Sequence, residues 1–184
     1  MLRDGRPIGT HRIDLVRDGD EVRVTVAIDL VVRIALVPVY RYTHRNREVW
    51  RAGRLQSIDA ATDDDGRSQF VRGRAVGDGF QVEASAGSLT VPADVIPTSY
   101  WRRETVARDR LLDTQSGRLL QVAAAREPAG DGTVRYRLTG DLRVNLWYDA
   151  ADRLLRIGFE LGGARFDYAP LDRAGAIRRT TAGG

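Results

Sequence analysis

Every second residue from Val22 to Leu36 is aliphatic. The even positions are all aliphatic, whereas the odd positions are mixed and partly polar: Val22, Val24, Val26, Ile28, Leu30, Val32, Ile34 and Leu36 alternate with Arg23, Thr25, Ala27, Asp29, Val31, Arg33 and Ala35. A period of two over this length predicts one long β-strand with one buried face. Because strands twist, the sheet around such a strand is expected to curl over its even face. Pro38 cannot donate a ladder hydrogen bond, so it predicts a bulge or bend directly after the strand.

Shorter segments with the same spacing follow along most of the chain. They include Ile13 and Leu15; Tyr40, Tyr42, His44 and Trp50; Phe80, Val82 and Ala84; Val134, Tyr136 and Leu138; Leu142, Val144, Leu146 and Tyr148; Ile157, Phe159 and Leu161; and Phe166 and Tyr168. The connections between them, such as DDDG, GDGF, TGD and LGGA, are short and rich in Gly and Asp, which is typical of hairpins. The pattern therefore predicts a mainly β fold, built as a single curled antiparallel meander sheet, a half-barrel of about nine to eleven strands.

One long interval, Thr90 to Gly117, breaks the meander. Pro92 and Pro97 interrupt strand pairing there, and Ser99 is placed to cap a short helix that would end near Ala107. The interval predicts a short helix or lid near residues 98–110 that covers the open side of the curled sheet.

The large aromatic residues of this interval are Tyr100 and Trp101. At least one of them is expected to pack against even-position aliphatic side chains such as Leu30 or Val32. We expect a single β domain over residues 1–172 and a flexible C-terminal tail over residues 173–184, because the tail lacks hydrophobic periodicity.

Composition excludes several classes of function. The chain has 29 basic residues and no cysteine, and every basic residue is arginine, so lysine and thiol chemistry are ruled out. Despite a net charge of +4, the arginines are scattered singly along the strands, which predicts no nucleic-acid partner. No apolar run is long enough for a transmembrane segment. The chain starts without an apolar signal segment, so we expect a periplasmic protein if a signal peptide has been removed and a cytoplasmic one otherwise.

Several segments, taken together, resemble a known group of proteins. GRPIGTHRI, VYRYTHRNREVWRAGRL, TDDDG, PTSYW, LLDTQSG and VNLWYD together resemble an uncharacterised bacterial family of domains of unknown function. The segment LWYDAADRLLRIGFELGGARFDY is similar to a second family of uncharacterised, mostly exported β-proteins, whose sheets are similar to the curled antiparallel sheets of bacterial lipoprotein carriers. The resemblance implies an envelope protein of half-barrel type, with an envelope protein as a possible partner, and it implies no established activity.

Candidate chemistry is sparse. His11 and His44 are the two histidines, and His44 shares a strand face with Tyr42 and Glu48, which is the minimum for general acid–base catalysis by a hydrolase or isomerase. No nucleophile motif accompanies them, so a half-buried structural histidine is the favoured interpretation. The acidic run Asp63, Asp64 and Asp65 before Gly66 could attract Ca²⁺, but it is also a good tight turn, and we predict no metal and no cofactor.

The long aliphatic face without a catalytic constellation favours a binding protein for an apolar small molecule or lipid, held in the concave face of the sheet. An enzyme that uses His44 and Glu48 in the same cavity is the alternative, and a protein-interaction module is the second alternative. The candidate ligand-binding residues are Leu30, Val32, Ile34, Tyr40, Tyr42, His44, Trp50, Tyr100, Trp101 and Tyr148.

Overall fold

The structure is a computed structural model that describes residues 1–34, 37–168 and 177–181. One sheet contains, in spatial order, β16 (Ile177–Thr181), β3 (Gly9–Asp18), β4 (Glu21–Ile34), β5 (Val37–Arg51), β6 (Arg54–Asp64), β7 (Arg67–Val76), β8 (Gly79–Ala84) and β9 (Gly87–Pro92). The other contains β10 (Arg110–Leu112), β11 (Leu119–Pro128), β12 (Val134–Gly140), β13 (Val144–Tyr148), β14 (Leu154–Leu161), β15 (Ala164–Tyr168), β1 (Leu2–Arg3) and β2 (Arg6–Pro7). A short 3₁₀ helix, η1 (Arg103–Ala107), lies between β9 and β10.

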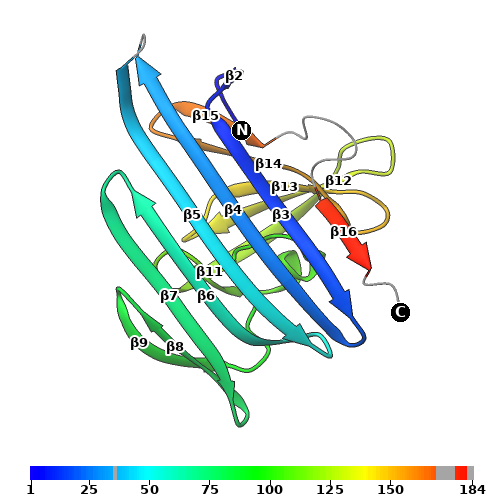
Figure 1. The fold of residues 1–184 in the computed structure, drawn as a ribbon. Helices are drawn as coiled ribbons and strands as arrows, with labels where there is room; N and C mark the ends of the chain where they lie inside the picture. The colour runs from blue at the N-terminus through cyan, green and yellow to red at the C-terminus, as the bar shows by residue number, and fades with distance from the viewer. Residues whose placement is uncertain (35–36, 169–176, 182–184) are drawn as a thin grey trace.

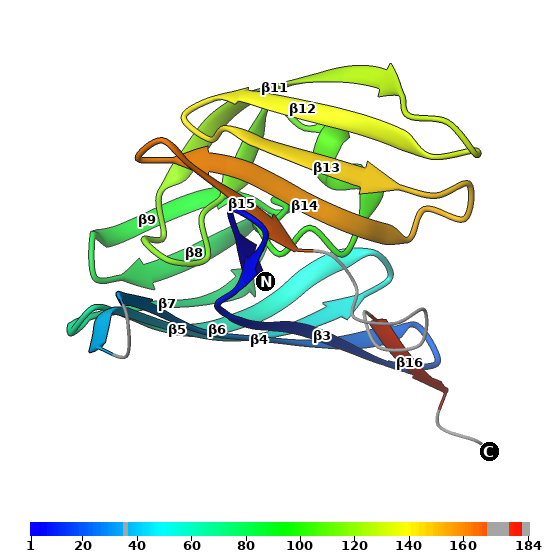
Figure 2. The same cartoon turned by 90° about the horizontal axis from the view of Figure 1, so that it is seen from above.

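The two sheets form two layers, with the long strands β3 to β7 in one layer and β11 to β14 in the other (Figures 1 and 2). The predicted mainly β, antiparallel fold is confirmed. The structure differs in dividing the strands between two sheets, where the sequence predicted one curled sheet. The physical reason is that a long strand with one aliphatic face needs a second layer to bury that face, and one short helix is too small to provide it.

The predicted long strand corresponds to β4, which pairs with β5 from Glu21–Arg51 to Ile34–Val37. From Val22 to Val32 its even side chains face the core, and Val24 is only 1% exposed. The register shifts between Val32 and Arg33, whose partner is Pro38, so the expected irregularity near this proline is present. Residues 35 and 36, the end of the predicted strand, lie outside the described residues.

The C-terminal part of the chain contributes β16, whose backbone pairs in parallel with β3. This strand falls inside the range predicted to be a flexible tail, and the rest of that range, residues 173–176 and 182–184, lies outside the described residues. Within the described ranges, no helix has the length and apolar character needed to span a membrane.

Residues 93–109, which we call the covering segment, connect the two sheets and contain η1. A short helix is present where the sequence predicted one, but Ser99 does not cap it. The residue at the N-cap position is Arg102, and it makes no capping hydrogen bond with its side chain. Tyr100 has a φ of 59°, which is not helical, so the helix cannot begin before this residue.

Two clusters of buried apolar side chains hold the layers together. The larger one lies between the sheets and includes Val24, Trp50, Leu146 and Tyr148. A smaller one gathers Met1, Leu30 and Val32 at the other end of β4. The sheets therefore pack against each other at both ends of the long strands.

Candidate functional site

A cavity of about 490 Å³ is the candidate site. The first sheet contributes side chains from β3, β4 and β5, and the second contributes β13, β14 and β15. Residues 98–100 of the covering segment, residues 113–115 of the turn before β11 and residues 140–143 from the end of β12 and the turn to β13 complete the wall. The cavity exists because the long strands of the first sheet present more inward surface than the shorter second sheet covers.

Part of the cavity wall is apolar. The even face of β4 supplies Val26 and Ile28, and the opposite sheet supplies Ile157, Phe159 and Tyr168. The ring centroids of Phe159 and Tyr168 are 5.9 Å apart, so the two rings form one continuous aromatic surface. These side chains line the space with hydrocarbon, which water solvates poorly.

The even positions of β5, which lie beside the even face of β4 in the same sheet, are unusually polar. Tyr42, His44 and Asn46 occupy even positions along this strand, and all three line the cavity. The Tyr42 hydroxyl donates a hydrogen bond to Gln115 Oε1 at 3.1 Å, which ties β5 to the turn before β11. His44 Nδ1 lies 2.8 Å from Thr62 Oγ1 on the neighbouring strand β6. The cavity therefore combines an apolar wall with polar groups, which come from β5, from the covering segment and from the turn before β11.

Both histidines line this cavity and remain uncharged at neutral pH. Burial lowers the pKa of His11 to about 4, with a further contribution from its proximity to His44. Burial also lowers the pKa of His44 to about 4, and the opposing effect of Asp113 is smaller. The rings of His11 and Tyr168 are nearly perpendicular to each other, with centroids 5.0 Å apart. Two neutral imidazoles give the cavity hydrogen-bonding capacity without positive charge.

Glu48, one step beyond Asn46 on the same face, is 1% exposed. Its carboxylate accepts hydrogen bonds from Asn46 Nδ2 at 2.7 Å and Trp50 Nε1 at 2.7 Å. Trp101 Nε1 of the covering segment donates to the same carboxylate at 3.2 Å. Burial raises the pKa of Glu48, and these hydrogen bonds oppose that effect. Glu48 thus fixes the covering segment to β5 directly beside the cavity.

The backbone at Tyr100 is strained, because a bulky residue at positive φ is rare. The Tyr148 hydroxyl of β13 donates to the Tyr100 carbonyl at 2.8 Å and to the Arg102 carbonyl at 3.3 Å. These bonds hold the segment in a conformation that places Tyr100 in the cavity wall.

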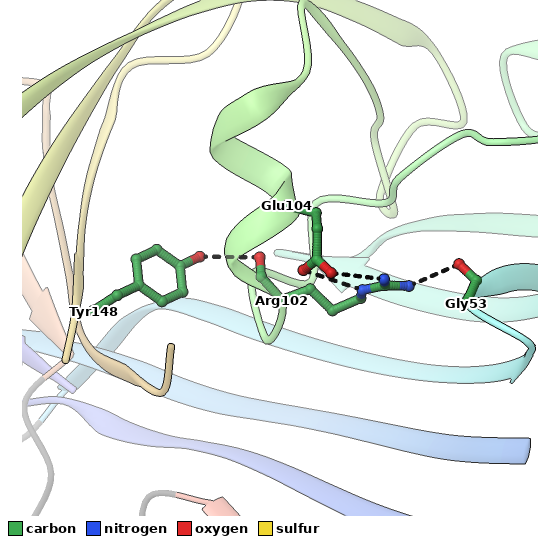
Figure 3. Close-up of polar contacts among 4 residues, drawn as sticks. All are labelled: Gly53, Arg102, Glu104 and Tyr148. Atoms are coloured by element: carbon green, nitrogen blue, oxygen red, sulfur yellow. Dashed lines mark hydrogen bonds and ion pairs between the residues drawn. The ribbon is translucent and has the colours of Figure 1, made fainter. Parts of the chain in front are cut away.

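Arg102 links the covering segment to the first sheet (Figure 3). Its guanidinium donates to the Gly53 carbonyl in the β5–β6 turn at 3.0 Å and pairs with Glu104 at 3.0 Å. The same group lies 4.6 Å from the centroid of the Trp50 ring, which is cation–π geometry. Together with Tyr148, Arg102 ties the segment to both layers.

The structure separates the predicted ligand-binding residues into groups. Tyr42, His44 and Tyr100 line the cavity, whereas Trp50 and Trp101 lie at the Glu48 end, where their ring centroids are 5.7 Å apart. The remaining candidates do not line it: Leu30, Val32 and Tyr40 belong to the smaller core cluster, Tyr148 supports the covering segment, and the side chain of Ile34 lies outside the described part.

Tyr100 and Trp101 pack on the larger core cluster, which contains Val24 and Val26, and not on the cluster of Leu30 and Val32. The cluster on which they pack contains even-position aliphatic residues from the other end of β4, and packing against Leu30 or Val32 is not observed. The reason is that the covering segment crosses the sheet near Trp50.

Sequence reasoning missed several cavity residues, including His11, Asn46, Gln115 and Phe159. The run of polar residues at even positions of β5 was a usable signal, because Asn46 lies between His44 and Glu48 on one face. Gln115 and Phe159 carry no such local signal, since they reach the cavity through the packing of the second sheet.

The acid–base alternative finds little support in this geometry. His44 lines the cavity, but its hydrogen bond goes to Thr62, and Glu48 is not part of the cavity wall. The acidic run forms a turn, as expected, because Asp63 Oδ1 accepts a hydrogen bond from the Gly66 amide at 2.8 Å and Asp65 has a φ of 52°. No group of three metal-ligating side chains occurs within the described residues.

In a comparison with protein families, residues 1–171 match the family described as Domain of unknown function (DUF6134). No curated protein and no solved structure matched the chain in the corresponding comparisons. The expected membership of an uncharacterised domain family is confirmed. The expected similarity to lipoprotein carriers stays a prediction.

Proposed function

The chain belongs to the DUF6134 family of domains of unknown function, and we propose from its own geometry that it binds a small, mainly apolar molecule in the cavity between its two sheets. The observation that carries the proposal is the space of about 490 Å³, partly open to solvent, with walls from both layers. Small-molecule sites typically measure about 300–1,000 Å³ and combine apolar walls with a few placed polar groups. The wall formed by Val26, Ile28, Ile157 and Phe159 beside the polar row of β5 has this character.

Binding would be driven by transfer of hydrocarbon from water into the apolar part of the cavity. Each buried methylene contributes about 0.8 kcal/mol, which is about a fourfold change in dissociation constant. Affinity for a series of straight-chain compounds should therefore increase with chain length and stop increasing once the cavity is full. A flat, exposed apolar surface would give no such limit.

The test is a titration of delipidated protein with a neutral, environment-sensitive naphthylamine dye, followed by displacement with the chain-length series. Ile28→Arg places a charge in the apolar wall and should abolish saturable dye binding. Thr25→Arg adds the same side chain to the exposed face of the same strand and should leave binding unchanged. Absence of saturable binding in the unmodified protein, or equal binding by both variants, contradicts the proposal.

Native mass spectrometry of the protein purified from its host provides an independent identification. A retained small molecule of mainly apolar composition supports the proposal. A stable second chain with no small molecule supports the interaction-module alternative.

A further inference from the structure

Two buried polar atoms at the cavity have no hydrogen-bond partner among the described residues: Asn46 Oδ1 and His11 Nε2. Asn46 is 1% exposed, and both residues belong to the cavity wall. A buried acceptor left unpaired costs about 1–3 kcal/mol, so such atoms are rare in folded proteins. Their occurrence together at one cavity indicates positions where a bound molecule supplies the missing partners.

Glu48 determines which end of the Asn46 amide is available. The carboxylate accepts a hydrogen bond from Asn46 Nδ2 at 2.7 Å, and a reversed amide would place two oxygens against each other. The Asn46 atom left unpaired at the cavity wall is therefore the acceptor Oδ1. A ligand group that satisfies it must donate a hydrogen bond, which a hydroxyl can do and a carboxylate or ether cannot.

The charges around the cavity disfavour an anion. Of the described residues in its wall, Asp113, Asp141 and Glu160 are acidic and Arg143 is basic. Both cavity histidines have pKa values lowered to about 4, so they supply no positive charge at neutral pH. An anionic head group would enter a negatively charged surrounding without a buried cation to pair with it.

The two unpaired atoms lie on different strands. His11 of β3 is opposite Ile28 of β4, and Asn46 of β5 is opposite Val26 of β4. Two strand spacings across and two residues along put the positions about 12 Å apart at the backbone. The apolar side chains of Val26 and Ile28 lie between them. A ligand with one hydroxyl on each side of an apolar stretch matches these two positions.

We propose that the cavity selects a neutral amphiphile with two separated hydroxyl groups, one donating to Asn46 Oδ1 and the other pairing with His11 Nε2 across the apolar strip of β4. The proposal rests on the proposed binding function and specifies its ligand class. It also assigns Asn46 and His11 as residues that determine specificity, and Glu48 as the residue that orients Asn46.

The test measures displacement of the naphthylamine dye by four compounds of matched chain length: a carboxylate, a methyl ether, a primary alcohol and a diol with one hydroxyl at each end. The alcohol should bind about tenfold more tightly than the ether or the carboxylate, since an unmet acceptor at Asn46 disfavours both of these. Diols of several chain lengths should be compared, and affinity should be highest at one length. At that length the diol should bind about tenfold more tightly than the alcohol.

Two variants act as controls for each other. Asn46→Leu should remove the preference for alcohol over ether, and His11→Phe should remove only the preference for diol over alcohol. Circular dichroism and dye affinity confirm that each variant is folded with an intact cavity. If Asn46→Leu does not fold, Glu48→Gln tests the same point. The glutamine amide can donate as well as accept, so it allows the Asn46 amide to adopt the opposite orientation. The preference for alcohol over ether should then become weaker.

The outcomes separate the two proposals. If the dye and all four compounds fail to bind, the proposed function itself is wrong. Saturable dye binding with equal affinity for the four compounds, or a diol no better than the alcohol, overturns the two-hydroxyl proposal and leaves apolar binding in place.

Discussion

Replacing Glu48 by alanine tests whether its buried carboxylate organises the region beside the cavity. The substitution leaves three donors without an acceptor: Asn46 Nδ2, Trp50 Nε1 and Trp101 Nε1. Each unpaired buried donor costs about 1–3 kcal/mol, and release of a buried charge offsets part of the sum. We expect a loss of about 3–5 kcal/mol in the free energy of unfolding. For a chain of this size, that loss corresponds to a decrease of about 6–20 °C in the melting temperature.

The assay is urea unfolding followed by tryptophan fluorescence, with calorimetry for the melting temperature. Glu83→Ala provides the matched control, because Glu83 is exposed on β8 and its loss should change stability by less than about 0.5 kcal/mol. If Glu48→Ala unfolds within about 0.5 kcal/mol of the unmodified protein, the carboxylate does not hold the covering segment and this reasoning is wrong.

The pH dependence of the same pair of proteins gives a second measurement. Since the pKa of Glu48 is raised in the folded state, the folded protein binds more protons than the unfolded chain above the ordinary value of 4.5. The contribution of Glu48 to stability therefore decreases as pH rises through the window that begins at 4.5 and ends at the raised folded value. The difference in stability between the unmodified protein and Glu48→Ala should become smaller across that window. A difference that grows with pH contradicts the raised pKa.

Two further predictions concern the cavity wall. Tyr100→Gly should be more stable than Tyr100→Ala by about 1 kcal/mol, because only glycine adopts a φ of 59° without steric cost; equal unfolding midpoints in urea would contradict strain at this position. The Cε1 proton resonances of His11 and His44 should titrate near pH 4 by NMR, and a midpoint near the ordinary value of 6.5 would contradict their burial. Because their pKa values are lowered in the folded state, both histidines should also reduce stability as pH falls from 6.5 to about 4, and His11→Phe should weaken that dependence.

The sequence alone determined the local architecture of the first sheet. The period of two along Val22–Leu36 identified β4 and the side it buries, because successive side chains of a strand point to opposite faces. Pro38 marked the irregular pairing near the β4–β5 hairpin, and the acidic run before Gly66 marked a turn, since both depend on the backbone preferences of single residues.

Tertiary structure decided where the cavity lies and what it offers. Trp50 and His44 share one face of β5, yet the covering segment seals Trp50 into the core, while His44 lines the cavity. Periodicity specifies which side chains face inward, but the docking of the second sheet, through contacts distant in sequence, decides which of them are covered. The unpaired oxygen of Asn46 likewise depends both on its own strand and on the docking of the second sheet. Its amide is oriented by Glu48 on its own strand, and its place in a cavity wall depends on a second layer that the pattern of β5 does not encode.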